Sequence, residues 1–199
     1  MTTATPARVE LLWIPLGAGA SVPVVRLNGL VYERLVAARE HRPPRDLYHA
    51  ALEVVVDEAR YVVEMTPAWG PAHQGGASVA TGPVGLRPLG RSRLFRYEVH
   101  CWRDGVIPDR AYAVGAPRAV STDPVVAQRV VDLAPYVPAA TWGRDEARTG
   151  DMWNSNSVVA WLLVRAGVDA DELAPPPNGS APGWAAGITV AHRSTLSHR

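Results

Sequence analysis

The 199-residue sequence predicts an α+β fold in which an antiparallel sheet packs against segregated helices. Two short apolar runs joined by a tight polar turn indicate a β-hairpin. Other segments carry apolar residues at helical spacing and have typical capping residues at their ends. The expected order of elements is strand, helix, hairpin, strand, helix, helix. An antiparallel sheet with separate helices satisfies that order naturally.

The first half of the chain contains the predicted hairpin. Residues 9–14 form a short apolar run stopped by a proline, which predicts a buried strand. Residues 29–41 alternate apolar and charged positions with helical spacing, and two prolines end the predicted helix. Residues 46–56 and 60–65, joined by the short turn 57–59, predict the two strands of the hairpin.

The second half begins with residues 66–90, whose six glycines and four prolines predict a long loop. Residues 91–102 alternate as a strand does, and residues 110–115 are a further candidate strand. Residues 123–133 predict a helix with Pro124 in its first turn and Ser121 or Thr122 as its cap.

The last predicted helix, residues 156–166, is mostly apolar and ends at Gly167. Residues 174–182 are a cluster of turn-forming residues, and the order of the tail after them is left open. We therefore expect one domain over residues 1–173 and a Pro/Gly-rich C-terminal extension over residues 174–199.

The composition is that of a globular protein, with 47% hydrophobic and 20% charged residues. The formal net charge is +1 and no basic run stands out, so nothing indicates nucleic-acid binding. Every cationic side chain among the 20 is an arginine, which excludes a lysine Schiff base.

Cys101 is the one cysteine, so no intrachain disulfide and no Cys-based zinc site can form. Residues 1–8 do not have the pattern of a secretory signal, and the stretch 9–25 is interrupted by prolines and glycines. We expect a cytoplasmic protein without a membrane span. The six histidines show no HxH or HExxH pairing, so we expect neither a metal nor a cofactor.

His49 and Glu64 are candidate functional residues on the predicted hairpin. By alternation, His49 shares a strand face with Ala51 and Glu53. Glu64 lies in an apolar segment of the return strand, where a carboxylate normally needs a partner. A histidine across the hairpin is one candidate. The alternative is a histidine at the rim and a glutamate at an edge, both facing water.

The turn that opens the last helix holds Asp151, Asn154, Ser155 and Ser157, all of which favour helix starts. Helix capping alone explains such a cluster. The same geometry also suits a nucleophile, because free backbone N–H groups there favour a developing negative charge. A serine needs a base, so Ser155 with His49 as base and Glu64 as the orienting acid would form a triad.

These three patches resemble the circularly permuted papain-like fold, to which lecithin–retinol acyltransferase and its bacterial relatives belong. YHAALEV resembles the element that carries the family's histidine, at His49. VVEMTP is similar to the strand with its polar orienting residue, at Glu64. WNSNSVVAWLL resembles the turn with the nucleophilic cysteine, where this chain has Ser155. The resemblance covers residues 47–167. It implies a papain-like α+β fold and hydrolase or acyl/amide transferase activity.

The serine is a departure from the family, because papain-like catalysis relies on a thiolate paired with a protonated histidine. Two functions remain open: a serine-dependent amidase or esterase, and an inactive member of the fold that binds a peptide, lipid or protein partner. Asn154 and Trp153 flank the serine, and we expect them to line a cleft for a small-molecule, peptide or lipid substrate. Trp153 as an ordinary core residue is the alternative. Cys101 lies in an alternating strand and is expected to be a small core residue.

Overall fold

The computed structural model describes residues 5–18, 33–69 and 78–196, and it confirms the α+β fold with an antiparallel sheet. The strands are β1 (Arg8–Pro15), β2 (Asp46–Val56), β3 (Ala59–Pro67), β4 (Ala80–Pro83), β5 (Arg96–Arg103), β6 (Arg118–Ser121) and β7 (Gly179–Ser180). The labelled helices are α2 (Pro124–Leu133), α3 (Ser155–Ala166) and α4 (Trp184–Leu196). Residues 33–39 are also helical, within the predicted helix 29–41, whereas residues 40 and 41 form a turn and residues 29–32 lie outside the described ranges.

The sheet has the strand order β4-β5-β3-β2-β1-β6, and all neighbours along this path are antiparallel. The short strand β7 adds a parallel pair at the start of β2. The predicted β2–β3 hairpin is confirmed. It turns through Asp57 (φ 48°) and Glu58 (φ 62°), a left-handed pair that matches the right-handed twist of the two strands.

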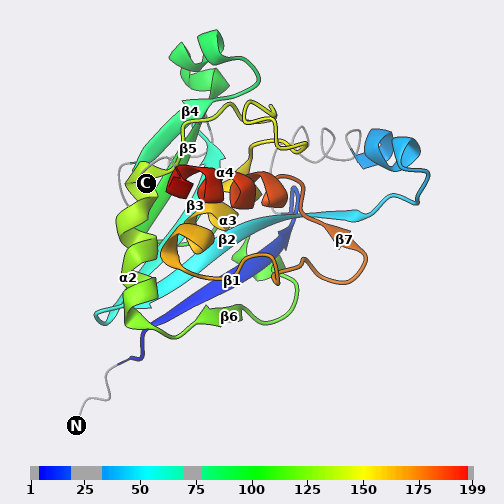
Figure 1. Cartoon of the computed structure of the whole chain (residues 1–199). Helices are drawn as coiled ribbons and strands as arrows, with labels where there is room; N and C mark the ends of the chain where they lie inside the picture. Colours follow the sequence, from blue (N-terminus) through cyan, green and yellow to red (C-terminus); the bar gives the residue numbers. More distant parts are fainter. Residues whose placement is uncertain (1–4, 19–32, 70–77, 197–199) are drawn as a thin grey trace.

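The main core lies between the sheet and the helices. Alternate residues of the central strands face the helices, as Leu11, Leu52, Val63 and Val99 do. Helix α3 lies between the sheet and α4 and also contacts α2, so almost its whole length is buried (Figure 1). This explains why its sequence is apolar on every side rather than on one stripe.

The opposite face of the sheet is partly covered by the segment between β5 and β6. Ile107 of that segment packs with Leu12, Ile14, Ala51 and Val62 in a second, smaller apolar cluster. Residues 110–115, a candidate strand in the sequence, instead contain a 3₁₀ turn at Arg110–Tyr112. The strand that pairs with β1 on the edge opposite β2 is β6, which begins a few residues after this segment.

Two further segments differ from the sequence prediction. The predicted loop 66–90 starts within the last two residues of β3, contains β4 and ends inside a 3₁₀ turn at Arg87–Arg91, while residues 70–77 lie outside the described ranges. The cap of α2 is Asp123 rather than Ser121 or Thr122, because the Asp123 carboxylate accepts the N–H of Val125 at 2.8 Å. Within the described ranges, no helix is long and apolar enough to cross a membrane.

The C-terminal segment 174–199, expected as an extension, contains β7 and α4, and both pack on the rest of the fold. The ring of Trp184 lies 4.9 Å from the ring of Trp13 on β1, measured between centroids. The Trp184 indole N–H also donates to the carbonyl of Ala170 at 3.0 Å. Burying this tryptophan stabilises α4. The Pro/Gly-rich residues before it gave no indication of this helix in the sequence.

Helix α4 approaches α3 closely at Gly187, and this contact gives a stability prediction. A Cβ at position 187 would lie 2.2 Å from the carbonyl oxygen of Ser157. We expect Gly187→Ala to lower the free energy of unfolding by about 2 kcal/mol, although alanine favours helices, because the two helices must separate. Ala185→Ser, at an exposed position of the same helix, should change it little. Denaturant unfolding of both variants checks this, and equal stabilities would contradict it.

Candidate active site

The start of α3 is a complete capping box. The Asn154 side-chain oxygen accepts the N–H groups of Asn156 and Ser157 at 2.9 and 3.3 Å. The Ser157 hydroxyl in turn accepts the Asn154 N–H at 3.0 Å. Two of the polar side chains in this turn are therefore engaged in capping, as the helix-start interpretation predicts.

Asn156 has a different role, since it connects the start of α3 to two other segments. Its side-chain amide donates to the carbonyl of Tyr48 at 3.0 Å and to the carbonyl of Pro182 at 2.8 Å. Tyr48 directly precedes His49 on β2. The first turn of α3 is thereby fixed against the strand that carries the candidate base.

The Ser155 side chain differs from those of Asn154 and Ser157, because it takes no part in the capping hydrogen bonds. Its hydroxyl makes no hydrogen bond with any residue in the described parts of the chain, and the residue is 8% exposed. It occupies the first position of α3, and the Asn154 side chain caps the next two N–H groups but not that of Ser155. A group bound next to the Ser155 hydroxyl would therefore meet the positive end of a helix.

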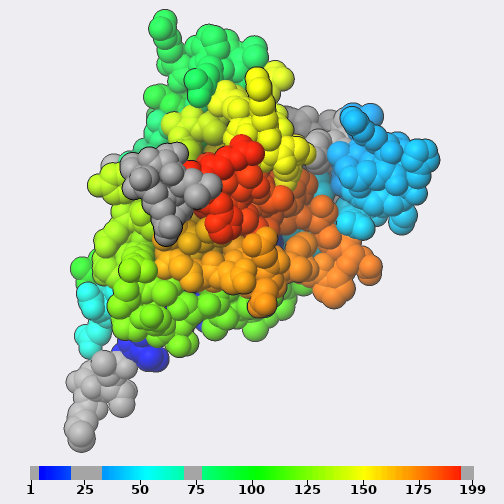
Figure 2. Space-filling model, viewed as in Figure 1, coloured from blue at the N-terminus to red at the C-terminus, as the bar shows by residue number. Residues whose placement is uncertain are grey.

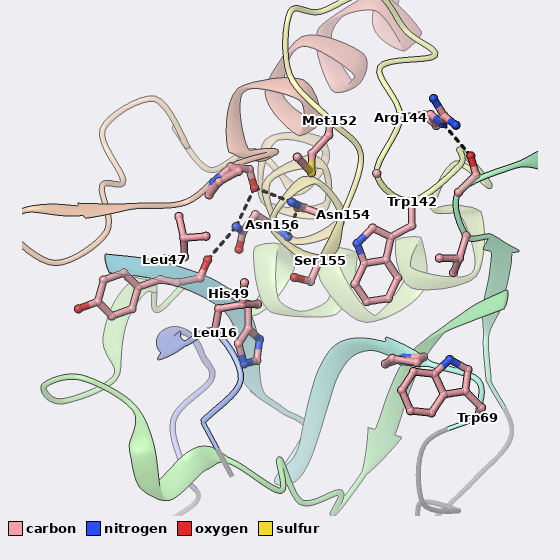
Figure 3. Close-up of a pocket in the computed structure, with 16 residues that line it drawn as sticks. Leu16, Leu47, His49, Trp69, Trp142, Arg144, Met152, Asn154, Ser155 and Asn156 are labelled. Atoms are coloured by element: carbon pink, nitrogen blue, oxygen red, sulfur yellow. Dashed lines mark hydrogen bonds between the residues drawn. The ribbon is translucent and has the colours of Figure 1, made fainter. Parts of the chain in front are cut away.

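Ser155 and His49 line the same pocket, which has a volume of about 480 Å³. Figure 3 shows both residues on one side of it, with the imidazole ring extending below the serine in this view. No hydrogen bond joins the two side chains in this part of the structure. The walls are mostly apolar and include Leu16, Leu47, Pro67, Trp69, Trp142 and Met152.

The carboxylate that contacts His49 belongs to Asp109, which sequence reasoning missed. His49 Nε2 lies 2.8 Å from the Asp109 carboxylate, and both side chains are largely buried. The segment holding Asp109 is fixed by its neighbour, since the Arg110 guanidinium donates to both oxygens of Glu53 at 2.7 and 2.9 Å. With Nε2 as donor to Asp109, the unprotonated Nδ1 is left to accept a proton.

Glu64, the predicted orienting residue, is close to this pair but makes no hydrogen bond to His49. Continuing the pairing of Leu52 with Val63, Glu64 stands level with Ala51, diagonal to His49. The residue is 5% exposed, and one carboxyl oxygen has no hydrogen-bond partner among the described residues. Burial, and then the charge of Asp109, raise the pKa of Glu64 to about 7, while His49 opposes the shift.

The other predicted site residues have different places. Asn154 lines the pocket, whereas Trp153 is buried beside it and does not. A backbone bridge pairs Trp153 with Trp142. Trp142 and Trp69 are the tryptophans that line the pocket. Only the sequence position of Trp153 suggested a cleft role, and position alone does not fix the direction of a side chain.

Cys101 is half-buried on β5, and burial raises the pKa of its thiol to about 11. It is therefore a thiol at neutral pH and a poor nucleophile. The described residues contain no group of three or more His, Cys, Asp or Glu side chains that could hold a metal ion. The polar side chains that line the pocket include the Ser155 hydroxyl, the His49 imidazole, the Arg144 guanidinium and the amides of Asn154 and Asn156, and the carboxylate of Asp109 contacts His49.

No protein-family model matches the chain, and neither a curated protein nor a solved structure matches it. The function of the pocket must therefore follow from its own residues.

The buried Glu64 predicts a pH-dependent stability. Its pKa in the folded protein, about 7, lies above the ordinary value of 4.5 for a glutamic acid, so folding favours the neutral form of the side chain. The stabilising contribution is complete below pH 4.5 and is lost as the pH rises through 7, by on the order of 3 kcal/mol. Glu64→Gln should lack this loss.

Unfolding in denaturant at acid and at alkaline pH measures the effect as the difference between Glu64→Gln and the unmodified protein. That difference should shift in favour of the variant as the pH rises. A difference that does not change with pH would show that Glu64 is not buried as a neutral acid.

Proposed function

We propose that this protein is a serine-dependent hydrolase or acyl/amide transferase built on a circularly permuted papain-like fold. Ser155 is the nucleophile and His49 the general base. Asp109 takes the orienting role that the sequence suggested for Glu64. The observation that carries the proposal is the shared pocket: an unbonded serine hydroxyl at a helix start and a histidine held by a carboxylate.

The arrangement of the elements supports the papain-like part of the proposal. The histidine lies at the start of a hairpin strand, and the nucleophile opens an apolar helix that packs on that strand. Asn156 joins these two elements at the site. The order of these elements along the chain is the one that the resemblance to the permuted papain-like family implies.

In the proposed reaction, the Ser155 oxygen attacks a carbonyl carbon of the substrate, and its proton passes to Nδ1 of His49. This transfer requires the two atoms to come within hydrogen-bond reach, directly or through one water, when substrate is bound. Asp109 then stabilises the imidazolium through the Nε2–H bond that already exists at 2.8 Å.

The charge that develops on the carbonyl oxygen has a stabilising group close by. Ser155 is the first residue of α3, and the capping bonds from Asn154 go to the N–H groups of Asn156 and Ser157, so the Ser155 N–H and the positive end of the helix would provide this stabilisation. His49 next returns its proton to the leaving group. Water, or an acceptor alcohol or amine, then resolves the acyl-enzyme. The volume of about 480 Å³ suits a small acyl group or a short peptide segment.

A second candidate is a non-catalytic binding pocket of the same fold. It is favoured by the serine in place of a thiol and by the missing hydrogen bond between Ser155 and His49. In this case the apolar walls would bind a ligand, and His49 and Asp109 would be a buried structural pair.

Labelling with a fluorophosphonate tests the catalytic proposal. We expect Ser155→Ala to abolish labelling and His49→Ala to slow it by at least about a hundredfold, because the hydroxyl then lacks its base. Ser180→Ala, which lies in β7 outside the pocket, is the control and should label normally. Labelling that persists in Ser155→Ala would refute the assignment of the nucleophile.

Replacing the nucleophile by a thiol distinguishes the two candidates. In a Cys101→Ala background, Ser155→Cys should create a thiol whose pKa falls below the usual value of about 8.5, since His49 can stabilise the thiolate. The rate of alkylation by iodoacetamide as a function of pH measures this pKa, and His49→Ala in the same background should restore the usual value. A profile identical to that of a free thiol would favour the binding pocket.

A further inference from the structure

The connection between β4 and β5 projects from the body of the protein. Residues 84–95 form two short 3₁₀ turns, Arg87–Arg91 and Arg93–Phe95, and neither contains a buried residue. Figures 1 and 2 show this segment, in green, standing out at the top of the view. We call residues 84–96 the β4–β5 tip.

The tip exposes large apolar side chains. Leu86, Leu89, Leu94 and Phe95 are 51%, 40%, 59% and 39% exposed. They belong to one compact unit, because Leu89 N donates to Leu86 O and Phe95 O accepts from Val84 N, at 3.1 and 2.8 Å. Exposed apolar side chains gathered on one projection mark an interaction surface rather than ordinary scatter.

The tip is also strongly basic. Its charged residues are all arginines: Arg87, Arg91 and Arg93 are exposed, whereas Arg96, the first residue of β5, is half-buried. The sequence has no acidic residue between Glu64 and Glu98. The formal net charge of the whole chain is only +1, so this is a local concentration of positive charge. One of these charges is compensated from outside the tip, since Arg87 pairs with Glu146 at 3.0 Å.

We propose that the β4–β5 tip docks onto an anionic phospholipid surface, with its leucines and phenylalanine entering the interface and its arginines contacting the headgroups. A convex projection with apolar and cationic side chains suits a lipid interface, which has apolar chains beneath a negative surface. An acidic protein partner would need the arginines but would leave the exposed leucines unexplained.

The tip adjoins the pocket described above. Val84 and Gly85 line that pocket, and so does Trp69, which is 43% exposed. Arg93 of the tip is tied to the Trp69 segment, because it donates to the carbonyl of Ala68 at 2.8 Å. A docked tip therefore brings one wall of the pocket to the lipid interface, where tryptophan is favoured.

Sedimentation with vesicles tests the proposal on the full chain. The protein should bind vesicles of mixed phosphatidylglycerol and phosphatidylcholine, and binding should weaken at high salt and be lost with pure phosphatidylcholine. The double variant Leu89→Ser/Leu94→Ser should bind at least about tenfold more weakly, because it loses two of the inserting side chains.

Leu35→Ser is the matched control, since Leu35 is 67% exposed in the helix at residues 33–39. It should bind as the unmodified protein does, and circular dichroism should show both variants folded. Arg91→Glu should weaken binding without touching an apolar group. The proposal is overturned by equal binding to neutral vesicles, by equal loss in Leu35→Ser, or by no binding to the anionic vesicles, and binding to an acidic polypeptide in that last case would indicate a protein partner instead.

Discussion

The site depends on the bond from the Asn156 side chain to the carbonyl of Tyr48. Asn156 is 2% exposed, and its amide joins the first turn of α3 to β2 and, through Pro182, to the segment before α4. Three parts of the chain that are far apart in sequence therefore meet at one buried amide. Buried donors of this kind specify one arrangement, because any other leaves the amide N–H groups without acceptors. Ser155 and His49 share a pocket as a consequence.

The strand alternation explains how His49 reaches that pocket. His49 belongs to the sheet face opposite α3, together with Ala51 and Glu53. His49 lies close to the beginning of β2, and the pocket is next to this first part of the strand, since Leu47 and Tyr48 line it too. The segment after β5 then supplies Asp109 from the far face. The helix side of the sheet provides the hydroxyl, and the other side provides the group that holds the imidazole.

The parts of this arrangement that local chemistry determines were predictable from the sequence. The hairpin follows from two apolar runs around a polar turn, and the start of α3 follows from Asn154 and its neighbours. Asp109 was not predictable, because it lies 60 residues from His49 in an irregular segment without periodicity. A Pro-Asp pair there indicates only a turn.

Helix α4 was missed for a related reason. Its glycine at position 187 lowers the helix propensity, yet the contact with Ser157 on α3 requires it. Long-range packing thus determines both the contact between Asp109 and His49 and the position of α4. Neither leaves a local pattern that a single sequence reveals.

The carboxyl groups around His49 bear on the choice between serine and thiol. Asp109 already places one negative charge 2.8 Å from the imidazole. Ionisation of the buried Glu64, whose pKa is raised to about 7, adds a second charge nearby. Because this pKa lies near neutrality, the negative charge around the Asp109–His49 pair differs between acid and alkaline solution. A thiolate needs an imidazolium as its partner, whereas a serine needs a neutral imidazole to receive its proton. In the reaction proposed for Ser155, the contact with Asp109 stabilises the imidazolium that forms once the serine proton has been transferred.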